Sequence, residues 1–183
     1  MTAAAHRPSQ REGLLAATLD LVRRGGSISM DSAARAGGVS KPGLMYHFST
    51  KQALLEALID HLIDRYEQDL EGLLPQGADA TPEQRIEAYL VWATTYTHDA
   101  ADLVMLADPK LRVPMSERWA ERFRPWTELP ADLSPARRAR LNAIRLMADG
   151  CWYSEATGIL PLTDDDRRAV LNDARQLLKR EDS

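Results

Sequence analysis

The sequence predicts an all-α protein, in which an N-terminal three-helix domain and a larger helical body together hold about nine helices. Two observations favour this fold class. Apolar residues recur at intervals of three and four along most of the 183 residues, and proline and glycine interrupt those runs without the alternation that marks strands. We expect the first domain to cover residues 8–66 and the body residues 67–183, with a long helix at 50–73 joining them.

The N-terminal domain is expected to hold three short helices. They are placed at about 10–24, 30–37 and 41–48. In the first helix, Leu14, Leu15 and Leu19 fall on one side at helical spacing, and a glycine pair then ends the helix. Ser49 or Thr50 caps the long helix that follows.

The body is expected to hold five further helices behind a loop of proline and glycine. Their approximate ranges are 82–98, 99–107, 115–124, 135–157 and 164–180. Thr81, Pro82 and Glu83 form a strong helix start, with a capping hydroxyl, a proline in the first turn and an acid next to it. Pro114 and Pro125 bracket the short helix at 115–124.

Residues 29–51 carry the most informative pattern in the chain, which indicates two short helices joined by a tight turn. Ser29 precedes the first helix, and its hydroxyl can accept a hydrogen bond from the first turn. Gly37 and Gly38 stop that helix and permit the left-handed backbone of a tight turn. Ser40 caps the second helix in the same way as Ser29 caps the first.

The second short helix has an inner and an outer face. Leu44 and Phe48 are four residues apart and share a buried face. The outer side keeps Lys41, Gly43, Tyr46 and His47. This is the layout of a helix-turn-helix, in which the second helix enters the DNA major groove. The pattern therefore indicates a protein that reads DNA and catalyses no reaction.

The run GGVSKPGLMYHFSTKQALLEAL at residues 37–58 resembles the TetR (tetracycline-repressor-like) family of bacterial transcriptional regulators. The matching positions are Gly38, Val39, Ser40, Lys41, Leu44, Tyr46, His47, Phe48 and Lys51. The positions that depart from the usual family pattern are Gly37, Pro42, Gly43 and Met45, where Ala, Gly, Thr and Tyr are common. These departures bear on the operator sequence and not on the mode of binding.

The resemblance implies a set of DNA contacts around the second helix. The implied set is Ser29, Ser40, Lys41, Pro42, Gly43, Tyr46, His47 and Lys51. The positions at 41–43 are expected to face bases, whereas Tyr46 and His47 contact phosphates. Lys51, at a helix start, holds a further phosphate beside exposed N–H groups. Arg7 and Arg11 could reach along the DNA backbone or into a minor groove.

The distribution of charge is consistent with this reading. The whole chain carries a formal net charge of −4. Residues 1–51 hold seven basic and three acidic side chains, a net charge of +4, whereas the remainder holds 16 basic and 24 acidic ones, a net charge of −8. Positive charge thus gathers where DNA phosphates would lie.

The resemblance also implies a small-molecule effector that is bound among the middle helices. All four tryptophans lie in the body, and aromatic and methionine side chains can line adaptable apolar pockets. The candidate pocket residues are Trp92, Tyr96, Met105, Trp119, Phe123 and Trp152. The same side chains also fill ordinary cores, and for any one of them a core position is the favoured interpretation, so the pocket rests mainly on the resemblance. His98, Asp99 and Asp102 match no metal-ligand spacing and are better explained as a capped helix junction. We expect neither a metal nor a cofactor.

In the family the last two long helices form a four-helix dimer interface, which here implies a homodimer through the helices at about 135–157 and 164–180. Ala148, Gly150 and Cys151 are small enough for close packing. Two-fold symmetry would place two recognition helices roughly 34 Å apart, so the operator should be a palindrome in double-stranded DNA.

The lone cysteine, Cys151, fits a cytoplasmic protein and reads as a core residue rather than a redox sensor. We find neither a signal peptide nor a membrane-spanning run. The expected function is that of a repressor released from its operator by a small apolar or amphipathic ligand. One alternative is a DNA-binding regulator controlled by a protein partner without a small ligand. A helical enzyme is a remote alternative, since no catalytic motif stands out.

Overall fold

The computed structural model describes residues 9–106 and 108–180 of the chain. Over these residues it is all α-helical, with eight α-helices and two short 3-10 helices, which confirms the predicted fold class. The N-terminal helices are α1 (Gln10–Arg23), α2 (Met30–Ala36), α3 (Lys41–His47) and α4 (Lys51–Leu73). The body adds η1 (Gly77–Asp79), α5 (Pro82–Thr95), η2 (Ala100–Leu106), α6 (Arg112–Thr127), α7 (Pro135–Thr157) and α8 (Asp164–Leu178).

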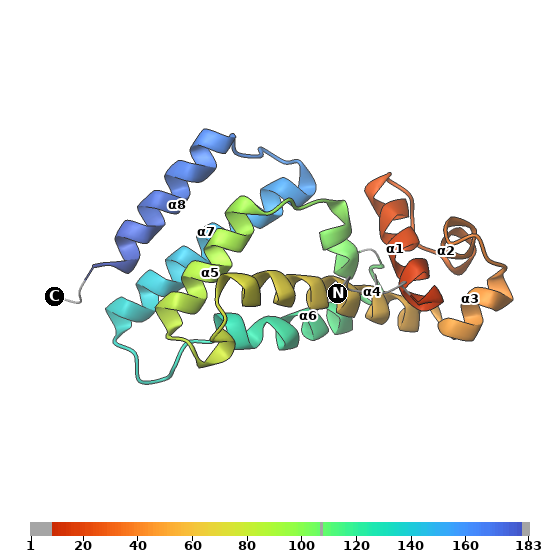
Figure 1. Cartoon of the computed structure of the whole chain (residues 1–183), viewed down its shortest axis with the longest axis horizontal. Helices are drawn as coiled ribbons and strands as arrows, with labels where there is room; N and C mark the ends of the chain where they lie inside the picture. The colour runs from red at the N-terminus through yellow and green to blue at the C-terminus, as the bar shows by residue number, and fades with distance from the viewer. Residues whose placement is uncertain (1–8, 107, 181–183) are drawn as a thin grey trace, which may run out of the picture.

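Helices α1, α2 and α3 form one end of the molecule, and α7 and α8 lie toward the other (Figure 1). The small end is held together by a core that includes Leu14, Leu44, Phe48 and Leu54, each with no more than 2% of its surface exposed. The recognition helix α3 and the helices expected to form a dimer are therefore well separated.

Helix α4 connects the two ends. Thr50 caps it by accepting a hydrogen bond from the backbone N–H of Ala53 at 3.0 Å. Its 23 residues span about 35 Å. Buried apolar side chains recur along this length, from Leu54 beside the helix-turn-helix to Leu70 within the body. Helix α4 thus runs through the single hydrophobic core that extends from the N-terminal helices into the body, as the periodic pattern at 50–73 predicts.

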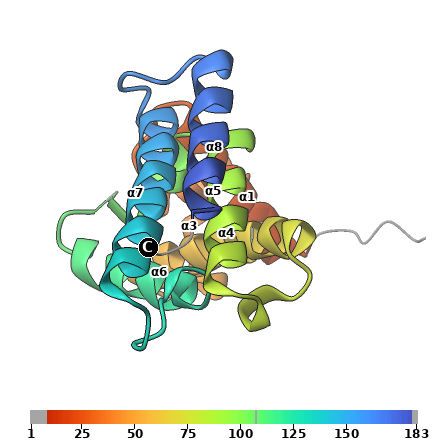
Figure 2. The same cartoon turned by 90° about the vertical axis from the view of Figure 1, so that its left-hand side faces the viewer.

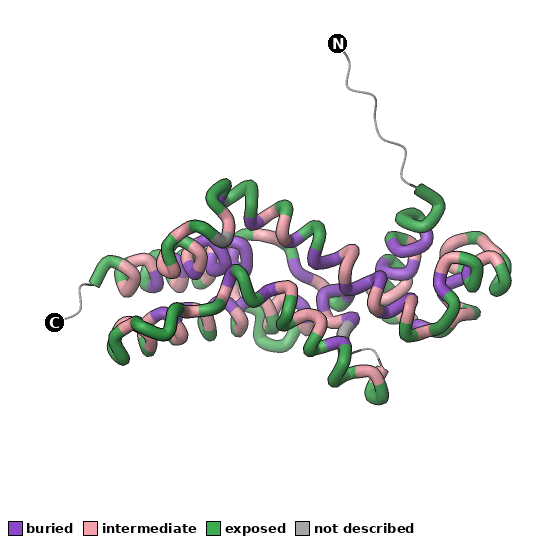
Figure 3. Tube along the Cα trace, turned by 90° about the horizontal axis from the view of Figure 1, so that it is seen from below, coloured by how far each residue is buried: buried purple, intermediate pink, exposed green. Residues whose placement is uncertain are grey.

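In the body, α5 packs mainly on α7, and α8 lies against both of them (Figures 1 and 2). Helix α6 packs along α4. A capping box between Thr81 and Gln84 starts α5, as the residues there predict. Figure 3 shows that the buried residues line the inward sides of these helices and that the outward sides are exposed. None of the described helices combines the length and the apolar character needed to cross a membrane.

Three details differ from the sequence prediction. Helix α5 ends at Thr95 rather than near residue 98, because Tyr96 takes an extended backbone conformation (φ −89°, ψ 157°). Residues 100–106 form a 3-10 helix with a kink at Leu103 instead of an α-helix. Helix α6 contains both Pro114 and Pro125, which the sequence prediction places just outside its two ends. Pro114 falls in the first turn, where its missing N–H costs nothing, and Pro125 falls in the last turn.

Candidate nucleic-acid interface

The turn between α2 and α3 is built by local hydrogen bonds. Ser29 and Ser32 form a reciprocal capping box at the start of α2, with N···O distances of 3.0 and 2.8 Å. Gly38 takes a left-handed conformation (φ 68°), in which a residue with a side chain would be strained. Gly37 does not, and its role is steric, since a Cβ atom there would meet the Leu14 side chain at 2.3 Å.

The inner side of α3 anchors it in the small core. Leu44 and Phe48 are 0% and 2% exposed, as expected for a shared buried face. The guanidinium of Arg11 lies 5.1 Å from the centre of the Phe48 ring, a cation–π distance that ties α1 to the end of α3. Ser40 accepts a hydrogen bond from the N–H of Gly43 at 3.2 Å, so its hydroxyl caps the helix.

The outer side of α3 presents its aromatic and basic residues to solvent. Tyr46 is 88% exposed, a large value for a tyrosine, and its ring meets that of His47 edge to face at 5.1 Å. Lys41 projects at the start of the helix, and its Nζ lies 3.0 Å from a carboxylate oxygen of Asp31. Pro42 is also exposed beside Lys41. Among the predicted contact positions of α3, Lys41, Pro42 and Tyr46 are thus exposed, whereas Gly43 and His47 are half-buried.

Besides Ser40 and Lys41, three predicted contact residues have other partners or fall outside the description. The Ser29 hydroxyl is occupied by the capping box. Lys51 is the first residue of α4, and its Nζ lies 2.6 Å from a carboxylate oxygen of Asp108. Arg7 lies outside the described residues.

Sequence reasoning missed the ionic contacts that join the N-terminal helices to the body. Besides the Lys51–Asp108 pair, Arg23 at the end of α1 donates to Asp99 at 2.8 Å. These partners are 57 and 76 residues apart in the chain, so no local pattern relates them. Asp99 and Asp108 flank η2. The segment around η2 is therefore joined to both α1 and α4.

Four of the six candidate pocket residues come together in the body. Trp92 (α5), Trp119 and Phe123 (α6) and Trp152 (α7) form a continuous set of ring contacts, which we call the ring cluster. The Trp119 and Phe123 rings stack with centres 4.9 Å apart, and Trp119 lies 5.7 Å from Trp152. The prediction did not include three further members, Tyr66, Tyr89 and His98.

A buried polar group lies against the ring cluster. The Tyr66 hydroxyl donates to one oxygen of Asp102, and His98 Nδ1 lies 3.0 Å from the other. Burial and the Asp102 carboxylate raise the pKa of Tyr66 well above its ordinary value. The N–H of Asp99 also donates to Asp102, at 3.3 Å, so this carboxylate caps the junction before η2. The Asp102 carboxylate therefore links the junction before η2 to α4 through Tyr66 and to the segment after α5 through His98.

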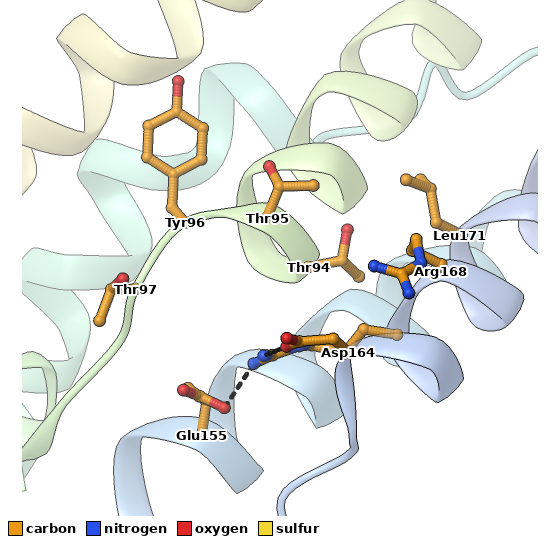
Figure 4. A pocket seen from close by; sticks show the side chains of 9 residues that line it. Thr94, Thr95, Tyr96, Thr97, Glu155, Asp164, Arg168 and Leu171 are labelled. Carbon is orange, nitrogen blue, oxygen red and sulfur yellow. Dashed lines mark hydrogen bonds and ion pairs between the residues drawn. The ribbon is translucent and has the colours of Figure 1, made fainter.

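The other two pocket candidates do not belong to the ring cluster as described. The side chain of Met105 lies outside the described part of the structure. Tyr96 lines a separate cleft of about 340 Å³ between the end of α5 and the start of α8 (Figure 4). Polar side chains dominate that cleft, and its Arg167 pairs with Glu155 at 2.7 Å.

A three-helix unit that exposes a recognition helix, carried on a helical body, defines the class of helix-turn-helix DNA-binding proteins. Comparison with known families gives a more specific result. Residues 14–58 match the family described as bacterial regulatory proteins, tetR family, and residues 83–179 match the tetracyclin repressor-like C-terminal domain. The second match alone covers more than half of the chain. The chain belongs to the TetR family of DNA-binding transcriptional regulators, which is not a family of enzymes.

Two relatives carry the name HTH-type transcriptional regulator EthR. The one from Mycobacterium tuberculosis (strain ATCC 25618 / H37Rv) is 28% identical over 122 residues, which are 66% of this chain. The match spans only 56% of that relative's length. The one from Mycolicibacterium smegmatis (strain ATCC 700084 / mc(2)155) is 27% identical over 172 residues, covering 87% of this chain and 79% of the relative.

Solved structures share the fold. A TetR family member from Streptomyces coelicolor A3 superposes with a TM-score of 0.60 at 19% identity, covering 91% of this chain and 98% of that one. Mycobacterium smegmatis AmtR gives a TM-score of 0.59 at 18% identity, with 100% and 92% coverage. At such identities the likeness concerns the fold alone.

Proposed function

We propose that this TetR-family regulator acts as a homodimer that binds a palindromic operator through α3 and leaves it when a small molecule binds the body. The observation that carries the proposal is the solvent-facing part of α3, which exposes both Lys41 and Tyr46, the latter at 88%. A large aromatic hydroxyl and a cation on one exposed helix are suited to phosphate oxygens and base edges. We assign residues 8–66 to DNA binding and residues 67–183 to regulation, with α4 crossing between them.

The proposed dimer face is the exposed side of α7. Ala139, Ala143, Leu146, Gly150 and Tyr153 follow one another at intervals of four and three residues, and all five are exposed. Such spacing gives a helix a continuous seam that a second helix can pack against. Small residues alternate with Leu146 and Tyr153, which are 59% and 48% exposed. We infer that a second copy covers this seam, together with α8.

The proposed effector site is the ring cluster. It joins α5, α6 and α7, and Tyr66 brings α4 into it. A ligand that displaces these rings would move α4 and the η2 junction, and α4 carries the helix-turn-helix. The DNA-bound state would then lose the spacing it needs between its two recognition helices. Coupling of this kind is reciprocal, so operator must weaken ligand binding by the same factor as ligand weakens operator binding.

Control by a protein partner, without a small ligand, is the second candidate. It is favoured by the packing of the ring cluster, whose rings are already in mutual contact at 4.5–6.5 Å between centres. In that case the partner would act on the exposed surface of the body.

Selection of bound duplexes from a random DNA pool tests the DNA-binding proposal. We expect an enriched palindrome, and we expect the double variant Lys41→Ala, Tyr46→Ala to bind it at least tenfold more weakly, since each lost contact costs about 1–3 kcal/mol. The matched control is Arg124→Ala, which removes one positive charge from an exposed position on α6 and should bind like the wild type. A double variant with unchanged affinity would refute the assignment of α3.

A further inference from the structure

Two indole N–H groups in the ring cluster are buried without a hydrogen-bond partner. Within residues 9–106 and 108–180, neither Nε1 of Trp92 nor Nε1 of Trp152 has an acceptor. Trp92 is 1% exposed as a whole residue, so solvent does not replace the missing acceptor. A buried donor without an acceptor destabilises a protein, and native structures contain few of them. These two donors therefore need an explanation.

The other polar groups that face the ring cluster have partners. The Tyr66 hydroxyl donates to Asp102, and His98 contacts Asp102 on one side and the backbone oxygen of Trp92, at 3.3 Å, on the other. The hydroxyl of Tyr89 donates to Asp149 at 2.8 Å. Acceptors thus exist nearby, but each is already engaged. Within the described residues, the indole donors are therefore left for an acceptor that a bound molecule would bring.

The surroundings of the two donors are aromatic and tight. The Trp92 ring lies 4.5 Å from His98, 4.9 Å from Tyr66 and 5.6 Å from Tyr89, centre to centre. A molecule that reaches Trp92 Nε1 must take the place of at least one ring, or slide between rings as a flat body. Flat apolar molecules suit such a site because they can stack as the rings do.

We propose that the effector is a small, flat, apolar molecule with a hydrogen-bond acceptor such as a carbonyl oxygen, and that Trp92 Nε1 donates to that acceptor. This inference rests on the proposed function, because it names the ligand class of the proposed effector site. Trp152 supplies the second donor. A pure hydrocarbon leaves both donors unpaired and binds more weakly. The Asp102 carboxylate, buried against the same rings, disfavours an anionic ligand.

The edge of the ring cluster shows where the molecule enters. Trp119 on α6 and Trp152 on α7 are both partly exposed, whereas Trp92 and Tyr66 behind them are 1% exposed. Trp119 and Trp152 are therefore the outermost rings. We place the entry between these two rings, because Trp119 stacks on Phe123 and Phe123 in turn contacts the Trp92 ring.

A matched pair of probes tests the proposal on the full-length protein. Acetophenone and α-methylstyrene are both flat and have nearly the same shape, and they differ in a carbonyl oxygen against a methylene group. With 15N-labelled tryptophan, the four indole N–H signals of the chain report on each donor separately. We expect acetophenone to shift the Trp92 signal downfield, as a new hydrogen bond does, and to bind about fivefold or more tightly than α-methylstyrene.

Two variants test whether the preference for acetophenone depends on the Trp92 indole. Trp92→Phe keeps a ring but removes the donor, and it should abolish the preference for acetophenone. Trp126→Phe makes the same change at another buried tryptophan of the body and should keep the preference. If Trp92→Phe fails to fold, the indole N–H signals of the wild-type protein still test the proposal.

Each remaining outcome overturns a different statement. Equal binding of both probes, with release of operator and no downfield shift at Trp92, would leave a ligand-responsive regulator but refute the donor role of the indole. Binding of neither probe up to its solubility limit would refute both the ligand class and the use of the ring cluster as an effector site. The DNA-binding proposal depends on α3 and is tested separately by duplex selection.

Discussion

The ammonium of Lys51 lies 2.6 Å from the carboxylate of Asp108, which joins the first turn of α4 to the segment between η2 and α6. The sequence predicts that Lys51 holds a DNA phosphate. In the structure, however, this cation is already paired with Asp108, an acidic residue of the body. The hydrogen bond from Lys51 lowers the pKa of Asp108, which keeps the carboxylate charged at neutral pH. A phosphate and Asp108 would compete for the same ammonium group.

Loss of the Asp108 charge should strengthen DNA binding. In Asp108→Asn the amide can still accept the hydrogen bond from Lys110, but it no longer neutralises Lys51. We expect operator affinity to rise about two- to fivefold, because an ion pair near the protein surface, such as this partly buried one, contributes little. Fluorescence anisotropy with labelled operator at several salt concentrations would measure it.

Two controls separate this competition from a general effect of charge. Asp132→Asn removes the same charge from an exposed position in the loop before α7 and should leave affinity nearly unchanged. In a Lys51→Met background, Asp108→Asn should have no effect, because the competing cation is gone. An equal gain in both backgrounds would contradict the competition.

The buried hydrogen bond from Tyr66 to Asp102 should contribute strongly to stability. Tyr66→Phe removes the donor and leaves a buried carboxylate less well satisfied, at a cost of about 1–3 kcal/mol. The Tm should therefore fall by several degrees. Tyr46→Phe, at an exposed tyrosine, is the control and should leave the Tm unchanged. Thermal unfolding followed by circular dichroism would show both.

The same tyrosine predicts how stability depends on alkaline pH. Burial and Asp102 raise the pKa of Tyr66 in the folded state, whereas in the unfolded chain it is about 10. Above pH 10 the unfolded state loses this proton and the folded state keeps it, so the free energy of unfolding falls as pH rises. Denaturant titrations between pH 9 and pH 11 should show a steeper fall for the wild type than for Tyr66→Phe. Equal slopes would argue against a buried, protonated Tyr66.

Local patterns predicted the helix-turn-helix well, because its determinants are neighbours in the chain. Ser40 caps the helix that it precedes, and Leu44 and Phe48 share a buried face at a spacing of four. The contacts that join the two parts of the molecule lie beyond such patterns. Tyr66 meets Asp102 across 36 residues, and that pair depends on how α4 and η2 pack. Composition placed the tryptophans in the body, but it could not say which rings contact one another or that Tyr96 lines another cleft.

Cys151 should react slowly with thiol reagents. It is buried on α7 at 7% exposure, and burial raises the pKa of its thiol above the ordinary value. The thiolate is the reactive form, so its fraction at pH 7 is smaller than that of a free cysteine, and the rate should keep rising through pH 9. Reaction with 5,5′-dithiobis(2-nitrobenzoate), compared with glutathione and with the unfolded protein, would measure this. Rapid reaction of the folded protein at pH 7 would instead indicate a redox role.

Gly150 offers the sharpest test of the proposed dimer face. A Cβ atom added there meets no atom within 4 Å in the single chain, and replacing a glycine inside a helix normally stabilises the helix by about 0.5–1 kcal/mol. Gly150→Gln should therefore fold at least as well as the wild type. In a dimer packed along the α7 seam, however, the added side chain would hold the two helices apart.

We expect Gly150→Gln to elute as a monomer under conditions in which the wild type is a dimer, as measured by light scattering after size-exclusion chromatography. Gly72→Gln is the matched control, because Gly72 is exposed on α4 and also has open space at its Cβ position. It should gain the same helix stability and remain dimeric. A Gly150→Gln protein that is as dimeric as the wild type would place the interface elsewhere. A monomer that still folds would separate assembly from folding, and its affinity for one operator half-site would then report the intrinsic strength of a single recognition helix.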